Sequence, residues 1–265
     1  MANESFFKYQ IANVIAILLA IIMNALVNIL PLNGVTTGVV SDSYPNLFTP
    51  PGYVFAIWAI IYSLAIVFAI YQIRGSEKDS KYLSKIGFWY LISSVINVTW
   101  LAFFHYSYGA SSLYLVSTLI LLILLSALIL IYVRLGIGKE EVTLREKIAV
   151  HFPFSIYLGW ISVASIAGIA SALNMIFPNL SYGTQALGTT IMLVVVLALT
   201  SLVLLKRRDL VFALVVVWAT SGIAVKQSSN QMIYLTALTV ASAILFEIFI
   251  IPITQRKSWL KYYLT

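Results

Sequence analysis

The sequence predicts an all-α integral membrane protein, a bundle of about eight transmembrane helices. Hydrophobic residues make up 61% of the 265-residue chain and charged residues only 9%, whereas soluble domains carry about a quarter charged residues. The apolar residues form blocks of roughly 20 residues, the length that an α-helix needs to cross a hydrocarbon core of about 30 Å. None of these blocks alternates polar and apolar residues as the strands of a membrane barrel do.

The hydrophobic blocks define eight spanning segments, which we place at residues 8–30, 52–73, 85–105, 111–134, 148–176, 185–205, 209–226 and 232–254. An even number of crossings puts both termini on the same side of the membrane. The seventh segment is the least certain to span fully, because the apolar run from Leu210 to Val225 is short for a bilayer and is followed at once by Lys226.

The basic residues test this topology. Fifteen of the sixteen lysines and arginines fall on one side, and only Lys226 falls on the other. The fifteen are Lys8, Arg74, Lys78, Lys81, Lys85, Arg134, Lys139, Arg145, Lys147, Lys206, Arg207, Arg208, Arg256, Lys257 and Lys261. By the positive-inside rule we expect both termini to be cytoplasmic, in the plasma membrane. The net charge of +7 then reflects topology, and we expect no nucleic-acid partner.

A long polar loop joins the first two segments. Its only charge is Asp42, and its regular structure is broken by Pro31, Gly34, Gly38, Pro45, Pro50, Pro51 and Gly52. The following helix, from Tyr53 to Tyr71, carries no charge and many aromatic residues. The predicted topology places this loop on the outer side of the membrane.

Charged side chains inside a bilayer are costly, which makes them candidates for function. Glu247 lies within the last segment, flanked by Leu245, Phe246, Ile248 and Phe249. Two interpretations stay open: a proton or cation site, or a carboxyl group that reaches the interface or is held protonated. Lys226 lies at a helix end, where an interfacial lysine is a better interpretation than a Schiff base with a retinal-type aldehyde.

Metal and nucleophile chemistry has little support in the sequence. Cysteine is absent, which excludes thiolate catalysis and thiolate metal sites. His105 and His151 are each of a type that ligates haem iron, but the topology puts them at opposite faces of the membrane, so they do not share a metal. The sequence has no nucleotide-binding loop, HExxH motif or nucleophile elbow. We therefore predict no metal site, no catalytic residue and no required cofactor.

Tryptophans and uncharged polar residues inside the segments are more informative. Trp58, Trp100 and Trp160 lie away from the ends of their segments, where an interfacial aromatic belt does not explain them. Asn97 shares a helix face with Trp100. Buried asparagines serve as hydrogen-bonding contacts between helices or line a cavity, and both interpretations stay open. Aromatic rings with a few polar groups between them suit a flat apolar ligand.

Three stretches together resemble one family. Thr49-Pro50-Pro51-Gly52-Tyr53-Val54-Phe55-Ala56-Ile57-Trp58, ending at Tyr62, is similar to the loop-to-helix signature of the TspO/MBR family of tryptophan-rich sensory and translocator proteins. Asn97-Val98-Thr99-Trp100, followed by Phe103-Phe104, resembles an element of that family's third helix, and Pro153-Phe154 with Trp160 resembles its fifth. The resemblance covers residues 1–176.

This resemblance implies a pocket for porphyrins, haem-related tetrapyrroles or sterol-like ligands, closed by the first loop, in a protein that often forms homodimers. The implied pocket residues are Tyr53, Phe55, Trp58, Tyr62, Asn97, Trp100 and Trp160. The implied lid contains Asn33, Asp42, Pro50, Pro51 and Gly52. Residues 1–176 would form a TspO-like five-helix bundle, and residues 177–265 would add three transmembrane helices and a cytoplasmic tail.

We therefore expect a non-enzymatic receptor or carrier whose partners are the lipid bilayer, a small hydrophobic ligand and a second copy of the chain. A small proton-coupled transporter that uses Glu247 is the alternative. A porphyrin-degrading enzyme, with Trp58 and Trp100 near the reacting ring, is a third hypothesis with less support, because no acid, base or metal site accompanies these rings.

Overall fold

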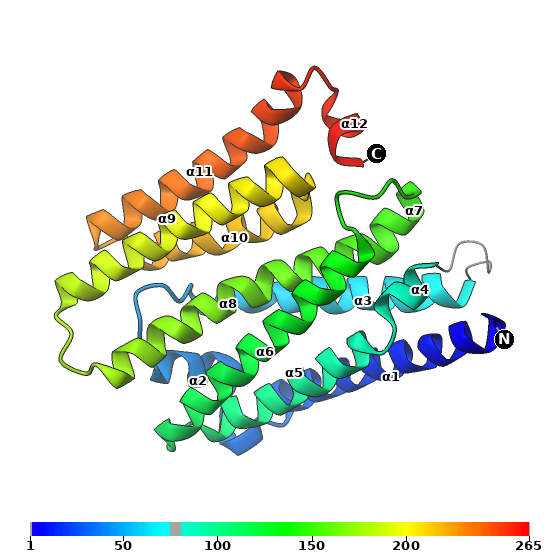
Figure 1. The fold of residues 1–265 in the computed structure, drawn as a ribbon. Coiled ribbons are helices and arrows are strands. Elements are labelled where there is room, and N and C mark those ends of the chain that lie inside the picture. Colours follow the sequence, from blue (N-terminus) through cyan, green and yellow to red (C-terminus); the bar gives the residue numbers. More distant parts are fainter. Residues whose placement is uncertain (1, 75–80, 265) are drawn as a thin grey trace.

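The computed structural model describes residues 2–74 and 81–264, and the regular secondary structure of this part of the chain is entirely helical (Figure 1). The long helices are α1 (Ala2–Ile29), α3 (Ile57–Arg74), α5 (Trp89–Tyr106), α6 (Ser111–Leu135), α8 (Phe152–Ile176), α9 (Tyr182–Arg207), α10 (Leu210–Lys226) and α11 (Gln231–Thr254). They correspond to the predicted segments, so the all-α membrane class is confirmed. Lys78, one of the basic residues that we assigned to the cytoplasmic side, lies outside the described residues.

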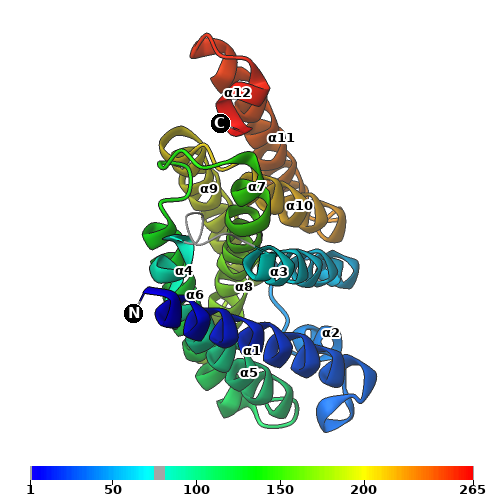
Figure 2. The same ribbon diagram turned by 90° about the vertical axis from the view of Figure 1, so that its right-hand side faces the viewer.

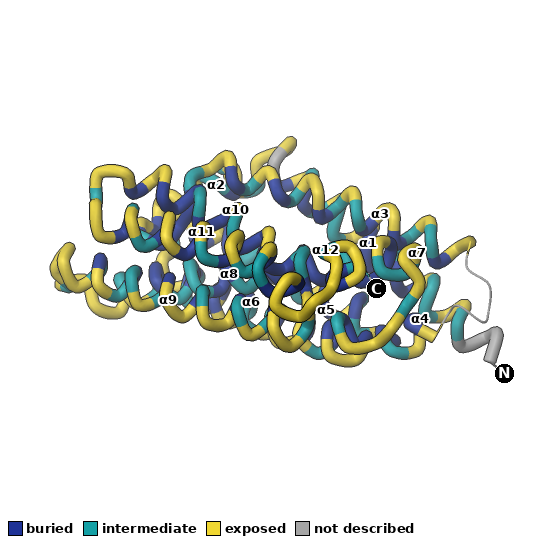
Figure 3. The backbone as a smooth tube through the Cα atoms, turned by 90° about the horizontal axis from the view of Figure 1, so that it is seen from above, coloured by how far each residue is buried: buried dark blue, intermediate teal, exposed yellow. Residues whose placement is uncertain are grey.

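Six of these helical stretches are long and apolar enough to cross a membrane. The exceptions are α5, which carries Asn97 and His105 in its buried face, and α10, whose 17 residues span about 26 Å. Many large apolar side chains are exposed, among them Leu199, Phe246 and Phe249. Exposed residues recur along the lengths of the helices (Figure 3). Such surfaces are typical of contact with lipid, and the protein is an integral membrane protein.

Three predicted boundaries differ from the structure. The third segment does not begin at residue 85, because Gly87 takes a φ of +55° and separates the short helix α4 (Lys81–Ile86) from α5. The first loop is not irregular throughout, since it contains the turns η1 (Leu32–Gly34) and η2 (Gly52–Ala56) and the helix α2 (Thr37–Ser43). The second segment therefore begins as the 3₁₀ turn η2 and becomes α-helical at Ile57.

The helices run back and forth along one bundle, and the two chain ends lie at the same end of it (Figure 1). Seen end-on, α8 lies in the middle, with α5 and α6 on one side and α10 and α11 on the other (Figure 2). Contacts with α3, α6 and α10 surround α8, and half or more of its residues are buried. The buried apolar residues before and after residue 176 form one continuous cluster.

Asp209 ties the later helices to the earlier ones. Its Oδ2 accepts hydrogen bonds from Tyr132 Oη of α6 at 2.8 Å and from Ser155 Oγ of α8 at 2.7 Å. Its Oδ1 accepts from the backbone N–H of Phe212 at 3.1 Å, which makes Asp209 the N-cap of α10. Asp209 is only 6% exposed, so one buried carboxyl group joins three helices.

Candidate ligand-binding cavity

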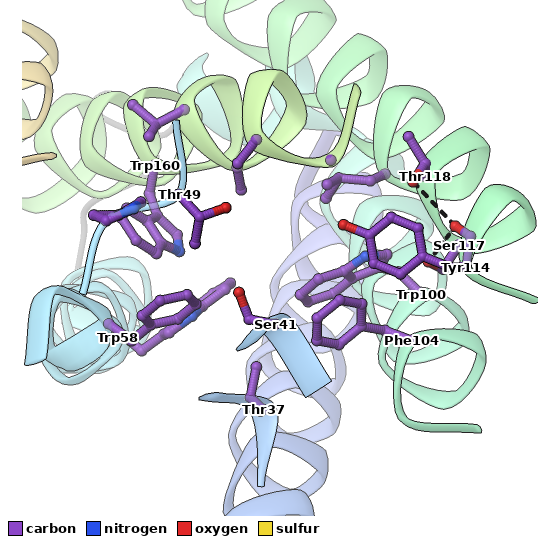
Figure 4. A pocket seen from close by; sticks show the side chains of 17 residues that line it. Thr37, Ser41, Thr49, Trp58, Trp100, Phe104, Tyr114, Ser117, Thr118 and Trp160 are labelled. Atoms are coloured by element: carbon purple, nitrogen blue, oxygen red, sulfur yellow. Dashed lines mark hydrogen bonds between the residues drawn. The ribbon is translucent and has the colours of Figure 1, made fainter. Parts of the chain in front are cut away.

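A narrow cavity of about 60 Å³ lies between α3, α5, α6 and α8, beneath α2 (Figure 4). Its lining consists of Thr37, Ser41, Thr49, Pro50, Phe55, Trp58, Trp100, Phe104, Tyr114, Ser117, Thr118, Leu121, Trp160, Val163, Ala164, Ala167 and Gly168. The rings of Trp58 and Trp160 lie on one side of the cavity, and those of Trp100, Phe104 and Tyr114 lie on the other. Hydroxyl groups from α2 and the following loop lie between them.

The rings are held by one another. Trp58 contacts Trp160 edge-on, with 6.4 Å between the ring centroids, and stacks on Tyr62 at 5.6 Å. On the opposite wall Trp100 stacks on Phe104 at 5.2 Å. Because each ring meets its neighbour in a favoured edge-on or stacked arrangement, the aromatic walls are formed before any ligand arrives.

A second, wider recess of about 600 Å³ lies on the α1 side. It is lined by Ile21, Asn24, Ala25, Thr36, Thr37, Gly38, Gly52, Phe55, Trp58, Ala59, Tyr62, Trp100 and Leu101. Thr37, Phe55, Trp58 and Trp100 line both spaces. These four side chains form the partition between the two compartments, and the recess falls within the size range of small-molecule sites, about 300–1,000 Å³.

The first half of the lid is anchored on the end of α5. Asn33 Nδ2 donates to the backbone oxygens of His105 and Tyr108, at 3.2 Å each. Thr37 Oγ1 lies 3.1 Å from His105 Nε2, and His105 Nδ1 lies 3.3 Å from the backbone oxygen of Leu32. His105 is fully buried, and the lid occupies both of its ring nitrogens. The histidine therefore serves as a lid anchor and has no nitrogen left for an iron.

Asn46 organises the second half of the lid. Its Oδ1 accepts from the backbone N–H groups of Phe48 and Thr49 at 2.8 Å, and its Nδ2 donates to Ser171 Oγ of α8 at 2.7 Å. Ser171 in turn donates to the backbone oxygen of Tyr44 at 2.7 Å. We did not identify Asn46 from the sequence, although an asparagine three residues before Thr49-Pro50 is typical of a side-chain-closed turn.

Helix α10 supports the hinge between the lid and α3. Trp218 Nε1 donates to the backbone oxygen of Val54 at 3.0 Å, and Gln227 Nε2 donates to that of Leu47 at 3.0 Å. Lys226 at the end of α10 forms an ion pair with Asp42 of the lid, with 3.6 Å between Nζ and Oδ1. The acidic residue of the loop and the lysine at the end of α10 are therefore partners.

The TSPO-like protein family matches residues 10–250 of this chain. The chain belongs to the TSPO-like family. The match includes α9, α10 and most of α11, so it extends well beyond residues 1–176, where the sequence motifs lie. Membership makes this a membrane protein of the ligand-binding or transport type. Neither the curated proteins nor the solved structures yield a match to the chain.

The cavities bring together most of the pocket residues that the sequence singled out. Phe55, Trp58 and Trp100 line both spaces, Trp160 lines the first and Tyr62 lines the second. Of the predicted lid residues, Pro50 lines the first cavity and Gly52 the second, while Pro51 lines neither. Asn33 and Asp42 act as the lid anchors described above.

Three other candidates lie apart from the cavity walls. Tyr53 is half exposed, and its ring packs against Trp218, with 5.9 Å between the ring centroids. Asn97 is buried behind the wall, where its Oδ1 accepts from Asn24 Nδ2 at 3.3 Å. Glu247 lies between α11 and α9, where one carboxylate oxygen accepts from Ser201 Oγ at 2.8 Å.

The cavity also uses residues that the sequence analysis did not select. These are hydroxyl and aromatic groups on α2, the lid, α5 and α6, namely Thr37, Ser41, Thr49, Phe104, Tyr114, Ser117 and Thr118. The α6 residues belong to a helix that is apolar on all sides, so no amphipathic face marks the side that meets the cavity. The adjacent hydroxyls of Ser117 and Thr118 were the only local signal.

Gly222 of α10 permits the close approach to the hinge. A Cβ atom at this position would lie 2.4 Å from Cγ2 of Val54. Alanine usually stabilises a helix by about 1 kcal/mol relative to glycine, but here overpacking opposes that gain by about 1–3 kcal/mol. We therefore expect Gly222→Ala to lower the melting temperature, measured by intrinsic fluorescence in detergent. Gly188→Ala on α9, where no atom lies within 4 Å, is the matched control and should not lower it; equal effects would contradict the steric account.

Proposed function

We propose that this TSPO-like chain is a non-enzymatic membrane receptor or carrier for a flat hydrophobic ligand, a tetrapyrrole such as porphyrin or haem, or a sterol-like molecule. The ligand enters the wider recess on the α1 side and the adjoining cavity between α3, α5, α6 and α8, and it is covered by the lid. One observation carries this proposal: two aromatic walls, with Trp58 and Trp160 on one and Trp100 and Phe104 on the other, face each other across the cavity.

Facing aromatic walls favour a planar apolar ligand, because stacking and edge-on contacts then form on both of its faces. The hydroxyls of Ser41 and Thr49 lie where they offer hydrogen bonds to a polar group at the ligand's edge. No required cofactor takes part in this proposal, because the tetrapyrrole is the bound ligand.

The same proposal includes an orientation in the membrane. Fifteen of the sixteen basic residues fall on the side of the termini in the predicted topology, so we place both termini in the cytoplasm and the lid outside the plasma membrane. The ligand then reaches the cavity from the outer side or from the lipid. A homodimer is part of the proposal through the resemblance of the chain to its family.

The function is tested by titrating the purified protein, in neutral-lipid nanodiscs, with protoporphyrin IX and following tryptophan fluorescence. We expect saturable quenching, because Trp58, Trp100 and Trp160 line the cavity, and competition by haemin. Cholesterol in a parallel titration tests the sterol-like ligand. Quenching that rises linearly without saturation, together with no binding of cholesterol, would exclude a receptor for this ligand class.

Proton-coupled transport is the second candidate function. The observation that favours it is Glu247, whose Oε2 is buried and has no hydrogen-bond partner among the described residues, in a helix that spans the membrane. On this hypothesis Glu247→Gln abolishes proton-driven uptake of the ligand into proteoliposomes while equilibrium binding persists. Unchanged uptake by the variant would remove Glu247 from the mechanism.

A further inference from the structure

A polar cavity, separate from the two spaces described above, lies at the opposite end of the bundle from the lid, near the chain termini. Its inner part occupies about 20 Å³ and is lined by Ile137, Gly138, Lys147, His151, Phe152, Ser155, Arg207, Arg208, Asp209, Leu210, Tyr263 and Leu264. A wider opening of about 320 Å³ adjoins it and shares Gly138, Lys147 and Arg208 with it. The opening adds residues of the α6–α7 connection (α7, Leu144–Glu146) and of α12 (Trp259–Leu264) to the walls.

The charge that faces this combined cavity is positive. Its basic side chains are Lys139, Lys147, Arg207, Arg208, Lys257 and Lys261, and its acidic ones are Glu140, Glu141 and Asp209. Two of the three acids are already engaged: Glu140 pairs with Lys85, and Asp209 accepts the three hydrogen bonds described above. Lys147, which lines both parts, has no ion pair among the described residues.

His151 gives an independent indication of a ligand. It lines the inner cavity and is only 2% exposed, yet neither of its ring nitrogens has a hydrogen-bond partner within the described part of the chain. A buried polar group without a partner is costly and rare. His151 ends η4 (Lys147–His151), a π-helical stretch, and such stretches are frequent at functional sites.

The arginines are held in position around the cavity. Arg207 Nη1 donates to the backbone oxygen of Ile137 at 3.3 Å, and its guanidinium lies 5.5 Å from the ring centroid of Tyr132. The guanidinium of Arg208 lies 5.1 Å from the ring centroid of Tyr262. Cation–π contacts of this kind orient a guanidinium and leave N–H groups for a further partner. Gly138 permits this packing, because a Cβ atom there would collide with the backbone oxygen of Arg207.

We propose that this cavity is a binding site for a phosphate group. Lysine and arginine donors fit phosphate oxygens with strong charge-assisted hydrogen bonds, and an unpartnered buried imidazole adds another donor. The site lies at the ends of membrane helices, the level at which basic pockets hold phospholipid head groups. A lipid head group and a soluble phosphate share this chemistry. The site is separate from the aromatic cavity and does not depend on the ligand proposed there.

The test uses the full chain in nanodiscs of phosphatidylcholine. In one arm, inorganic phosphate is titrated and its binding is measured by calorimetry. In the other arm, phosphatidic acid is added to the nanodiscs and the lipid that remains bound is measured by native mass spectrometry. Loss of one charge-assisted hydrogen bond is expected to weaken binding about tenfold or more in Lys147→Gln, and His151→Phe is expected to weaken it as well. Lys206→Gln is the matched control, because Lys206 is exposed at the end of α9 next to Arg207 and lines neither part of the cavity.

Either arm supports the proposal when binding is saturable, weakens in both site variants and is unchanged in the control. Binding of phosphatidic acid alone identifies a lipid head group, and binding of free phosphate alone identifies a soluble ligand. No binding in either arm overturns the proposal. An equal loss in Lys147→Gln and Lys206→Gln also overturns it, because a diffuse basic surface would then explain the binding.

Discussion

Replacing Trp58 with alanine is expected to weaken binding of protoporphyrin IX about 30-fold, because a buried aromatic contact of this kind contributes about 2 kcal/mol. Trp58 lines both compartments and is braced by Tyr62 and Trp160. Its removal therefore eliminates one of the two tryptophan rings on that wall of the cavity. It also removes the contacts that hold the neighbouring rings of Tyr62 and Trp160. The effect should lie mainly in a faster dissociation rate.

The measurement is a titration followed by porphyrin absorbance, which does not depend on the number of tryptophans. Trp89→Ala is the matched control, since Trp89 is also a partly buried tryptophan and lies outside both cavities. We expect this variant to bind with the affinity of the unaltered chain. Equal affinity of the Trp58 and Trp89 variants would place the porphyrin elsewhere and refute the proposed cavity.

Replacing Asp209 with alanine should lower the free energy of unfolding by about 3–5 kcal/mol. The substitution removes the N-cap of α10 and leaves the buried hydroxyls of Tyr132 and Ser155 without their shared acceptor. These three groups join α6, α8 and α10, so the loss should loosen the attachment of the last helices to the rest of the bundle.

Thermal or denaturant unfolding in detergent, followed by tryptophan fluorescence, measures this effect. Asp209→Asn keeps one carbonyl oxygen as an acceptor, and we expect it to lose clearly less stability than Asp209→Ala. An exposed aspartate provides a second comparison: Asp42→Ala removes only a solvent-accessible ion pair, worth about 0–1 kcal/mol. If Asp209→Ala is no worse than Asp42→Ala, the carboxyl group does not join the helices.

Contacts at the two ends of α10 join the helices beyond residue 176 to the first five helices. Helix α10 holds the lid through Trp218 and Gln227 on one side of the bundle. Its opposite end is capped by Asp209 and joined to α6 and α8. A movement of α10 would therefore displace the backbone of the lid hinge, to which Trp218 and Gln227 are hydrogen-bonded. The extent of the family match, residues 10–250, agrees with this arrangement.

The membrane class, the positions of the long helices and most of the aromatic wall could be predicted from the sequence alone. These features depend on local composition: apolar blocks of a length that spans a bilayer, and tryptophans away from the ends of their segments. The pairing of aromatic positions on three helices came from the family motifs.

Only the tertiary structure decided which polar groups meet. It pairs Asp42 with Lys226 and joins Trp218 to Val54 across 164 positions of sequence. It packs Tyr53 against Trp218, apart from the cavity walls, while the ring of Tyr114 on α6 lines the cavity. Helices that are apolar on all sides carry no amphipathic stripe to show which face is internal. The physical reason is that lipid and protein interior are equally apolar, so small differences in packing between helices choose the buried face.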